Sequence, residues 1–296
     1  MTNQVKAMIL GFMAVFLWST VATAFSLSLS QQSPAQLLLV ASFTSLLFLI
    51  TLIIYKKQWS ELVFHFIESW KSSLFFGAIN PFIYYLVLLE AYNLLPAQEA
   101  QAINYTWAIM LSFMAVPILK QKLVFFDLIA AACCYFGVLV IATNGSPLSL
   151  EFSNFYGVIL ALVSTIIWAS YWLLNTKDQR PSLIGLTLNF AFALPLILIY
   201  WWLTEDNIQW SDKGVLSAIY IGFFEMGLTF VLWNNALKLT SKATKVANLI
   251  FLAPILSIFW LSQFTDEAVK ISTLIGLACI LIGLTVQNIA KARKEN

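Results

Sequence analysis

The stretch PAQEAQAINYTWAIMLSFMAVP, residues Pro96–Pro117, decides how the rest of the chain is interpreted. It has the length and apolar character of a membrane-crossing helix. Its first half nevertheless carries five polar side chains: Gln98, Glu99, Gln101, Asn104 and Tyr105. Lipid offers these groups no hydrogen-bond partner, so they must face protein or water. Asn104 and Trp107 share one helical face, which predicts a helix that borders a cavity on a transport pathway.

The composition places the whole chain in the membrane. Of its 296 residues 60% are hydrophobic and only 10% are charged, whereas soluble domains average about 25% charged residues. The first apolar stretch is followed by many more and has no small-residue cleavage pattern, so we expect it to be a membrane span and not a signal peptide. Cys133, Cys134 and Cys279 all lie in apolar runs, where we expect them to fill space. Because the chain has one histidine, we expect no metal site.

Ten segments are long and apolar enough to cross a bilayer, which needs about 20 helical residues. Uninterrupted apolar runs are not typical of barrel strands, so the predicted fold is an all-α integral membrane protein with ten transmembrane helices. The predicted spans are Ala7–Leu29, Ala35–Tyr55, Ser72–Tyr92, Ala97–Leu119, Val124–Thr143, Phe155–Leu174, Ser182–Leu203, Gly214–Leu237, Ala243–Gln263 and Ile271–Ile289.

Basic residues set the predicted orientation. With the N-terminus in the cytoplasm and ten spans, only Lys213 and Lys270 fall on the outer side, and the other 14 of the 16 Lys and Arg fall on the cytoplasmic side. This is the positive-inside pattern, and it predicts that both termini are cytoplasmic. The cytoplasmic segment QWSELVFHFIESWK (residues 58–71) alternates apolar and polar residues at helical spacing. We expect it to form an amphipathic helix in the lipid headgroup region.

The chain resembles itself at an offset near 145 residues. Gly77 corresponds to Gly222 and Ala102 to Ala247, and in the first helix of each half LWST (17–20) corresponds to IWAS (167–170) at an offset of 150. Five spans per copy is an odd number, so the second copy must enter the membrane from the opposite side. We therefore predict two inverted five-helix repeats, residues 1–150 and 151–296, which favour alternating access around a site near the midplane.

Several motifs together resemble a known family. With ten spans in two halves, FLAPILSIF (251–259) and a Trp in the first helix of each half are similar to the drug/metabolite transporter superfamily with EamA repeats. LWST, EAQAINYTW (99–107), IIWASY (166–171) and LWNNAL (232–237) look like its bacterial aromatic amino acid exporter branch. This resemblance implies a monomeric ten-helix carrier that exports amino acids or related metabolites across the inner membrane.

Glu225 is the most informative candidate site residue, because it lies near the middle of the eighth predicted span. A charge there costs at least about 2.5–3.5 kcal/mol on insertion scales. Glu225 is expected either to bind a substrate ammonium group or a coupling proton, or to hydrogen-bond between packed helices. Its repeat partner is Asn80, which stands beside Pro81.

The remaining candidates are amides, aromatic rings and one further acid. They could hydrogen-bond a substrate, stack on it or attract its ammonium group, and helix packing is the alternative for each. For Glu99, stabilisation of its own helix N-terminus is a further alternative. The predicted substrate-binding residues are Trp18, Asn80, Tyr84, Glu99, Asn104, Trp107, Trp168, Tyr171, Glu225 and Asn248.

The predicted function is that of a secondary carrier for a small metabolite, with aromatic or large neutral amino acids as the leading substrates. The sequence contains no nucleotide-binding or nucleophile motif, so we expect no cofactor, no catalytic residue and no nucleic-acid partner, only a small-molecule substrate and membrane lipid. A multidrug exporter of the same fold and an importer remain alternatives. An intramembrane enzyme would need a convergent acid–base or metal constellation that the sequence does not show.

Overall fold

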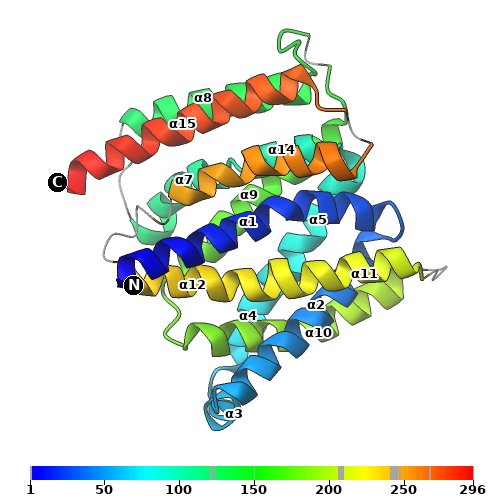
Figure 1. Ribbon diagram of the computed structural model, residues 1–296, viewed down its shortest axis with the longest axis vertical. Helices are drawn as coiled ribbons and strands as arrows, with labels where there is room; N and C mark the ends of the chain where they lie inside the picture. The colour runs from blue at the N-terminus through cyan, green and yellow to red at the C-terminus, as the bar shows by residue number, and fades with distance from the viewer. Residues whose placement is uncertain are drawn as a thin grey trace. The chain divides into compact units, whose positions relative to one another are not determined.

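The computed structural model describes residues 2–120, 123, 125–149, 151–205, 210–240, 246, 248–266 and 268–295, and every regular element within these ranges is helical (Figure 1). The α-helices are α1 Asn3–Leu29, α2 Pro34–Tyr55, α3 Trp59–Glu68, α4 Trp70–Gly77, α5 Tyr84–Leu94, α6 Ala97–Asn104, α7 Trp107–Leu119, α8 Phe125–Ala142, α9 Phe155–Asn175, α10 Ser182–Thr204, α11 Asp212–Tyr220, α12 Thr229–Leu239, α14 Leu252–Phe264 and α15 Ile271–Glu295. Two π-helical segments, η1 Ala78–Ile83 and η2 Ile221–Leu228, and a 3₁₀ turn, η3 Asn248–Phe251, complete the set.

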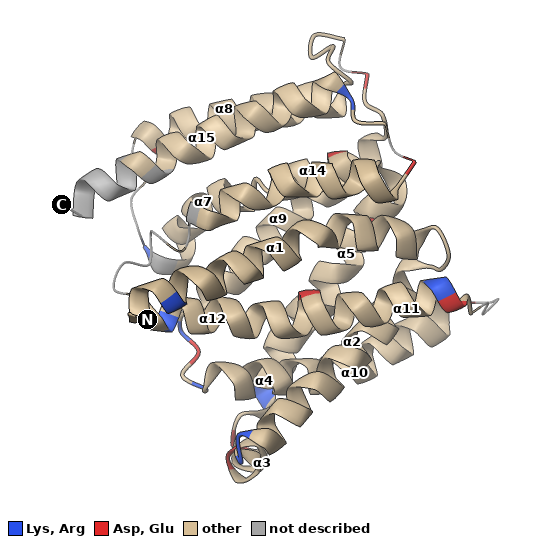
Figure 2. Cartoon of the chain, in the orientation of Figure 1, with Lys and Arg blue, Asp and Glu red and all other residues tan. Residues whose placement is uncertain are grey.

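Among the described residues, seven helical stretches are long and apolar enough to cross a membrane: Asn3–Leu29, Pro34–Tyr55, Trp70–Leu94, Phe125–Ala142, Phe155–Asn175, Ser182–Thr204 and Asp212–Leu239. Leu249–Phe264 and Ile271–Gln287 are shorter apolar helices. Most charged residues lie at helix ends and in the connections between helices (Figure 2). The prediction of an all-helical membrane protein is confirmed, while the count of ten spans stays a prediction. The predicted start of the ninth span at Ala243 lies outside the described residues.

The predicted fourth span, Ala97–Leu119, is divided in the structure into α6 and α7. At the junction the backbone N–H of Thr106 donates to the carbonyl of Ile103 (3.0 Å) and the Thr106 hydroxyl donates to the same oxygen (2.8 Å). A threonine side chain that competes for a backbone carbonyl favours a turn over a continuous helix. No proline or glycine marks this break, so helical periodicity alone did not reveal it.

The helices form two compact units, and each unit draws on both halves of the sequence. Unit 1 contains Met1–Leu86 and Asp178–Ser257, and unit 2 contains Val87–Lys177 and Ile258–Asn296. The predicted repeats, 1–150 and 151–296, divide the chain in a different way and stay a prediction.

In unit 1, α1 lies along α11 and α12, α2 packs against η2 and α10, and α10 packs against α4 and η1 (Figure 1). Two glycines set the closest approaches. A Cβ on Gly77 would overlap the backbone oxygen of Asn189, and a Cβ on Gly222 would overlap the backbone oxygen of Ala41. Small residues let helix backbones approach closely in a membrane.

In unit 2, α15 lies alongside α8 over much of its length, and α9 packs against α6 and α7 (Figure 1). Gly137 on α8 and Gly276 on α15 face each other so closely that a Cβ on either would meet the backbone oxygen of the other. A Cβ on Gly283 would meet both the Cys134 sulfur and the backbone oxygen of Ala130. Cys134 thus fills space between two helices, as the sequence predicted.

Candidate functional site

The eighth predicted span changes its helical geometry where Glu225 lies. η2 is π-helical, so its backbone bonds no longer follow the regular i to i−4 pattern. Side-chain hydroxyls bond to backbone carbonyl oxygens of η2. The Thr229 hydroxyl donates to the backbone oxygen of Phe224, and the Ser45 hydroxyl donates to that of Met226 (3.1 Å). π-Helical turns within longer helices occur frequently at functional sites.

The third predicted span is also interrupted, at Asn80. η1 contains Asn80 in a non-helical conformation (φ −143°, ψ 118°), directly before Pro81. Proline lacks a backbone N–H and favours an extended residue before it, which accounts for the break. The Asn80 side chain is buried, and its Oδ1 has no hydrogen-bond partner among the described residues. A buried amide oxygen in this state is available to a donor from a bound molecule.

Glu225 extends from η2 to a group of aromatic side chains in the same unit. The Tyr85 hydroxyl donates to Glu225 Oε1 at 3.1 Å, and Trp18 contacts the same carboxyl group. Glu225 Oε2 is buried and finds no hydrogen-bond partner in the described part of the chain. Such an oxygen costs about 1–3 kcal/mol when it is left unsatisfied. The carboxyl group can therefore accept one further donor.

The two aromatic residues that contact this carboxyl group, Tyr85 and Trp18, each pack against further rings. Trp18 packs edge-on against Phe230 (ring centroids 6.2 Å apart) and lies 5.2 Å from Trp233. Tyr84, another predicted site residue, is buried with its ring 4.9 Å from that of Tyr85. Among the predicted site residues the structure thus brings Trp18 to Glu225, and places Tyr84 against the tyrosine that binds Glu225. The combination of a carboxylate and ring faces is suited to an ammonium group.

The unit 2 candidates form a second, separate group of contacts. Asn104, at the end of α6, donates from Nδ2 to the Ser164 hydroxyl (2.9 Å) on α9. On α9 Trp168 stacks on Tyr171 with ring centroids 5.7 Å apart, and both side chains are buried. Trp107 is partly buried at the start of α7. The side chain of Asn248, an amide candidate in unit 1, lies outside the described residues.

Glu99 is fully buried, and both of its carboxylate oxygens have protein partners. Lys270 Nζ lies 2.7 Å from Oε1, and the Ser153 hydroxyl donates to Oε2 at 2.9 Å. Lys270 also donates to Asn144 Oδ1 (2.7 Å). Glu99 therefore links α6 to the connections that follow α8 and α14, and its predicted role as a substrate ligand stays a prediction.

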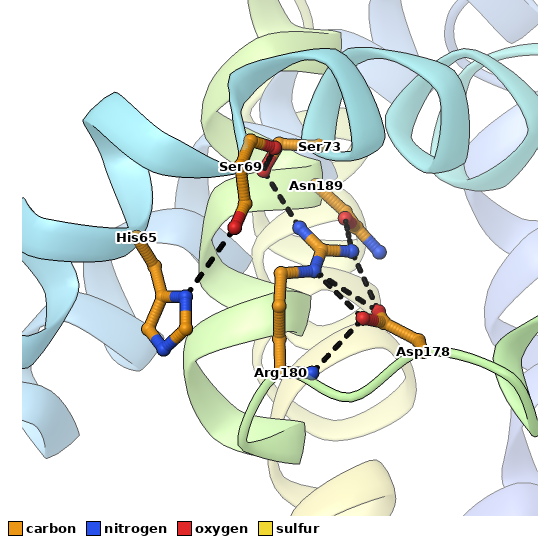
Figure 3. Close-up of polar contacts among 6 residues, drawn as sticks. All are labelled: His65, Ser69, Ser73, Asp178, Arg180 and Asn189. Carbon is orange, nitrogen blue, oxygen red and sulfur yellow. Dashed lines mark hydrogen bonds and ion pairs between the residues drawn. The ribbon is translucent and has the colours of Figure 1, made fainter.

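A buried ion pair in unit 1 was not among the predicted site residues (Figure 3). Arg180 Nη2 lies 2.7 Å from Asp178 Oδ2, and both side chains are at most 10% exposed. Arg180 further donates to the Ser73 hydroxyl (2.6 Å) and to Asn189 Oδ1 (3.1 Å). In the sequence, Arg180 is one of many basic residues predicted to be cytoplasmic, and only the proline that follows it indicates a defined turn.

Tyr85 and a second buried acid were also missed. Asp127, at the start of α8, is buried and accepts from Gln287 Nε2 (3.0 Å), which also donates to the Ser112 hydroxyl (2.8 Å). An acid in the first turn of a helix is common because it offsets the helix dipole, so its position alone carried no signal. Tyr85 lay unnoticed because one tyrosine in an apolar span is ordinary.

Known proteins resemble this chain over most of its length. The model of the EamA-like transporter family matches residues 5–143 and 155–289. The chain is 26% identical over 232 residues to the uncharacterized transporter YvbV of Bacillus subtilis (strain 168), which covers 77% of this chain and 75% of that protein. It is 23% identical over 254 residues to the inner membrane protein YtfF of Escherichia coli (strain K12), with coverage of 77% and 78%. One solved crystal structure shares the fold, with a TM-score of 0.67 and 20% identity over 98% of this chain and 99% of that one.

Proposed function

The chain belongs to the EamA-like transporter family, whose members are transporters and not enzymes, and we propose that it is a secondary exporter of small amine-bearing metabolites. Aromatic or large neutral amino acids are the leading substrates. It works by alternating access in the bacterial inner membrane, as a monomer with both termini in the cytoplasm. The strongly positive-inside distribution of lysine and arginine supports this orientation.

The arrangement around Glu225 is the observation that carries the proposed substrate class. One carboxylate oxygen is held by Tyr85, and the other is buried with no partner in the described residues. A substrate ammonium group would satisfy that oxygen, and the Trp18 ring would supply a cation–π or stacking surface beside it. A proton on the same oxygen would be the competing occupant, which gives a simple route for coupling transport to a proton gradient.

Two further observations support inverted repeats and hence alternating access. The π-helical segments η1 and η2 lie at equivalent positions, since residues 78–83 correspond to 223–228 at the offset of 145. The family model also matches twice, over stretches of similar length. Paired helix breaks at equivalent places in two halves are typical of transporters that bind substrate near the repeat interface.

The connection between the first and second helices of each half also contacts the start of the third helix of the other half. Gln32 donates from Nε2 to the backbone oxygen of Gly214 (3.0 Å). Arg180 donates to Ser73, whose hydroxyl donates to the backbone oxygen of Ser69 (2.9 Å). Ser69 and Gly214 stand 145 residues apart, so each connection holds the start of the third helix of the other half. This reciprocal pattern is what a two-fold relation between halves would produce.

The test is counterflow in proteoliposomes loaded with unlabelled phenylalanine or tryptophan. We expect saturable entry of the labelled amino acid for the natural protein. Glu225→Gln keeps the size of the side chain and a group that can accept from Tyr85, but removes the charge. Loss of a charged hydrogen bond of about 1.5–3 kcal/mol predicts a 10- to 100-fold weaker apparent affinity.

Glu68→Gln is the matched control, because Glu68 is an exposed glutamate on α3, and we expect its kinetics to be unchanged. Counterflow of chemically diverse cations, with no exchange of any amino acid, would favour a multidrug exporter of the same fold. Identical kinetics for Glu225→Gln and the natural protein would remove Glu225 from the proposed site.

A further inference from the structure

Helix α3 is anchored on unit 1 by one of its edges. Leu62 is buried and packs in a cluster with residues of α2 and α10, and Phe66 stacks on an α10 ring with centroids 5.2 Å apart. Their partners are Ile53, Ile184, Leu188 and Phe192. This edge fixes how the helix is rotated about its axis, and so fixes which residues face away from the bundle.

A second apolar stripe on α3 faces outward. Trp59, Val63 and Ile67 follow one another at intervals of four residues and are 52%, 43% and 65% exposed. Side chains four apart lie on one face of a helix. On an amphipathic helix at the membrane surface, such a stripe is the face that meets the boundary between headgroups and acyl chains.

The charges of α3 and its flanks are segregated. Lys56 and Lys57 stand just before the helix and Lys71 just after it, and all three are exposed. Lys71 Nζ lies 5.6 Å from the centre of the Trp70 ring. At 100° per residue, the polar residues Glu61, His65 and Glu68 lie on the opposite arc from the outward stripe.

The local contacts of these polar residues keep them on that arc. Gln58 donates to Glu61 Oε2 (3.1 Å), and His65 Nδ1 lies 3.4 Å from the Ser69 hydroxyl (Figure 3). The apolar stripe is therefore bordered by cations at both ends, and the acidic side chains lie away from it. Figure 2 shows basic and acidic residues gathered around α3.

We propose that α3 is a docking surface for anionic phospholipid in the leaflet beside it. The stripe of Trp59, Val63 and Ile67 enters the boundary between headgroups and acyl chains, and Lys56, Lys57 and Lys71 contact lipid phosphates. Tryptophan near both ends of the helix is the composition of a membrane interface. A lysine at an anionic membrane surface strengthens binding about fivefold, so three together contribute about a hundredfold.

The test uses the full chain in nanodiscs with a nitroxide label at Ile67→Cys. Cys133, Cys134 and Cys279 are replaced by serine, so that the label reports on one position only. The measured quantity is the ratio of label collisions with oxygen to collisions with a water-soluble nickel chelate, which rises as the label enters lipid. We expect the ratio to rise when phosphatidylglycerol is titrated into phosphatidylcholine nanodiscs.

Two triple variants separate local from general charge effects. The first variant combines Lys56→Gln, Lys57→Gln and Lys71→Gln. We expect its collision ratio not to rise as phosphatidylglycerol is added. The second variant combines Lys6→Gln, Lys213→Gln and Lys238→Gln, which remove the same amount of charge elsewhere on unit 1. We expect its collision ratio to rise with phosphatidylglycerol as in the natural protein. Circular dichroism and gel filtration confirm that both variants remain folded.

Four outcomes would overturn the proposal. The label could stay accessible to the nickel chelate in every lipid mixture, or its ratio could be the same with and without phosphatidylglycerol. The lipid dependence could survive in the variant that lacks Lys56, Lys57 and Lys71. A ratio that changed only with the number of protein copies per nanodisc would identify a second copy of the chain, rather than lipid, as the occupant.

Discussion

At the scale of single residues, the position of Glu225 is stabilised by donors that come from two other helices. Tyr85 at the start of α5 holds one oxygen, and Trp18 from the middle of α1 contacts the same group. A buried carboxyl group needs such partners because lipid supplies none. Its other oxygen, Oε2, has no hydrogen-bond partner among the described residues. It can therefore accept a hydrogen bond from a bound molecule without breaking an existing one.

Tyr85→Phe tests whether this hydrogen bond positions Glu225 for substrate. Loss of one hydrogen bond to a charged acceptor is worth about 1.5–3 kcal/mol, so we expect at least a tenfold rise in the half-saturating substrate concentration in counterflow, with unchanged protein yield. Tyr156→Phe is the control, because Tyr156 is an exposed tyrosine on α9. Equal kinetics in the two variants would contradict a positioning role.

Arg180→Ala tests the buried ion pair. It leaves Asp178 buried without its cation, which costs about 3–5 kcal/mol and lowers the melting temperature by about 10 °C. Removing both partners with Arg180→Ala and Asp178→Ala should cost less than Arg180→Ala alone, because no uncompensated charge then remains. A double variant as unstable as the sum of the single ones would show that the two side chains act independently.

At the scale of helices, unit 1 depends on close backbone contacts at Gly77 and Gly222. Each glycine faces a backbone oxygen of a neighbouring helix; Gly77 lies directly before η1, and Gly222 lies within η2. A contact with backbone cannot be relieved by rotating a side chain, so the helices themselves must move apart.

Gly77→Ala and Gly222→Ala should each destabilise the protein by about 1–3 kcal/mol, the usual cost of an overpacked contact. Thermal unfolding in detergent measures this cost. Gly185→Ala is the matched control, because the nearest atom to its added methyl group would be at an ordinary contact distance of 3.5 Å. If the Gly185 variant were as unstable as the other two, the close contacts would not be the cause.

The sequence could predict helices well because unbroken apolar runs and terminal signals are local. Ser33 shows this, since its hydroxyl accepts from the Gln36 backbone N–H and its own backbone N–H donates to the Gln36 side chain. These bonds begin α2 within one residue of the predicted start. Departures from regular α-helical geometry within a span could not be predicted in the same way. The π turn at Glu225 depends on hydroxyls of Ser45 and Thr229 meeting freed carbonyls, and helical periodicity does not show such contacts.

The candidate site was predictable in part for the same reason. A charge in the middle of an apolar run is visible in the sequence, which is how Glu225 was found. Its partner Tyr85 is separated from it by 140 positions, and nothing local identifies such a pairing. Glu99 was found as an unusual charge, but its buried bond to Lys270 is equally non-local.

At the scale of the whole molecule, the predicted orientation has a direct test. Lys57→Cys and Lys213→Cys place single thiols at exposed positions that the charge pattern assigns to opposite sides of the membrane, in a background without Cys133, Cys134 and Cys279. We expect an impermeant maleimide added to intact cells to label the thiol at 213 and to spare the one at 57 until the membrane is opened. Labelling at 57 and not at 213 would show that the protein has the opposite orientation in the membrane, and would contradict the proposed cytoplasmic location of both termini.

The division of the chain into units that each combine early and late helices has a consequence for biosynthesis. Unit 1 needs residues up to Ser257 and unit 2 needs residues from Ile258 onward, so neither unit can complete its packing while only the first half of the chain has left the ribosome. The early helices are therefore expected to insert into the membrane first and to pack against their partner helices only after those have been translated. A messenger truncated between the two halves would yield a product that inserts, finds no partner helices, and becomes a substrate for membrane proteolysis.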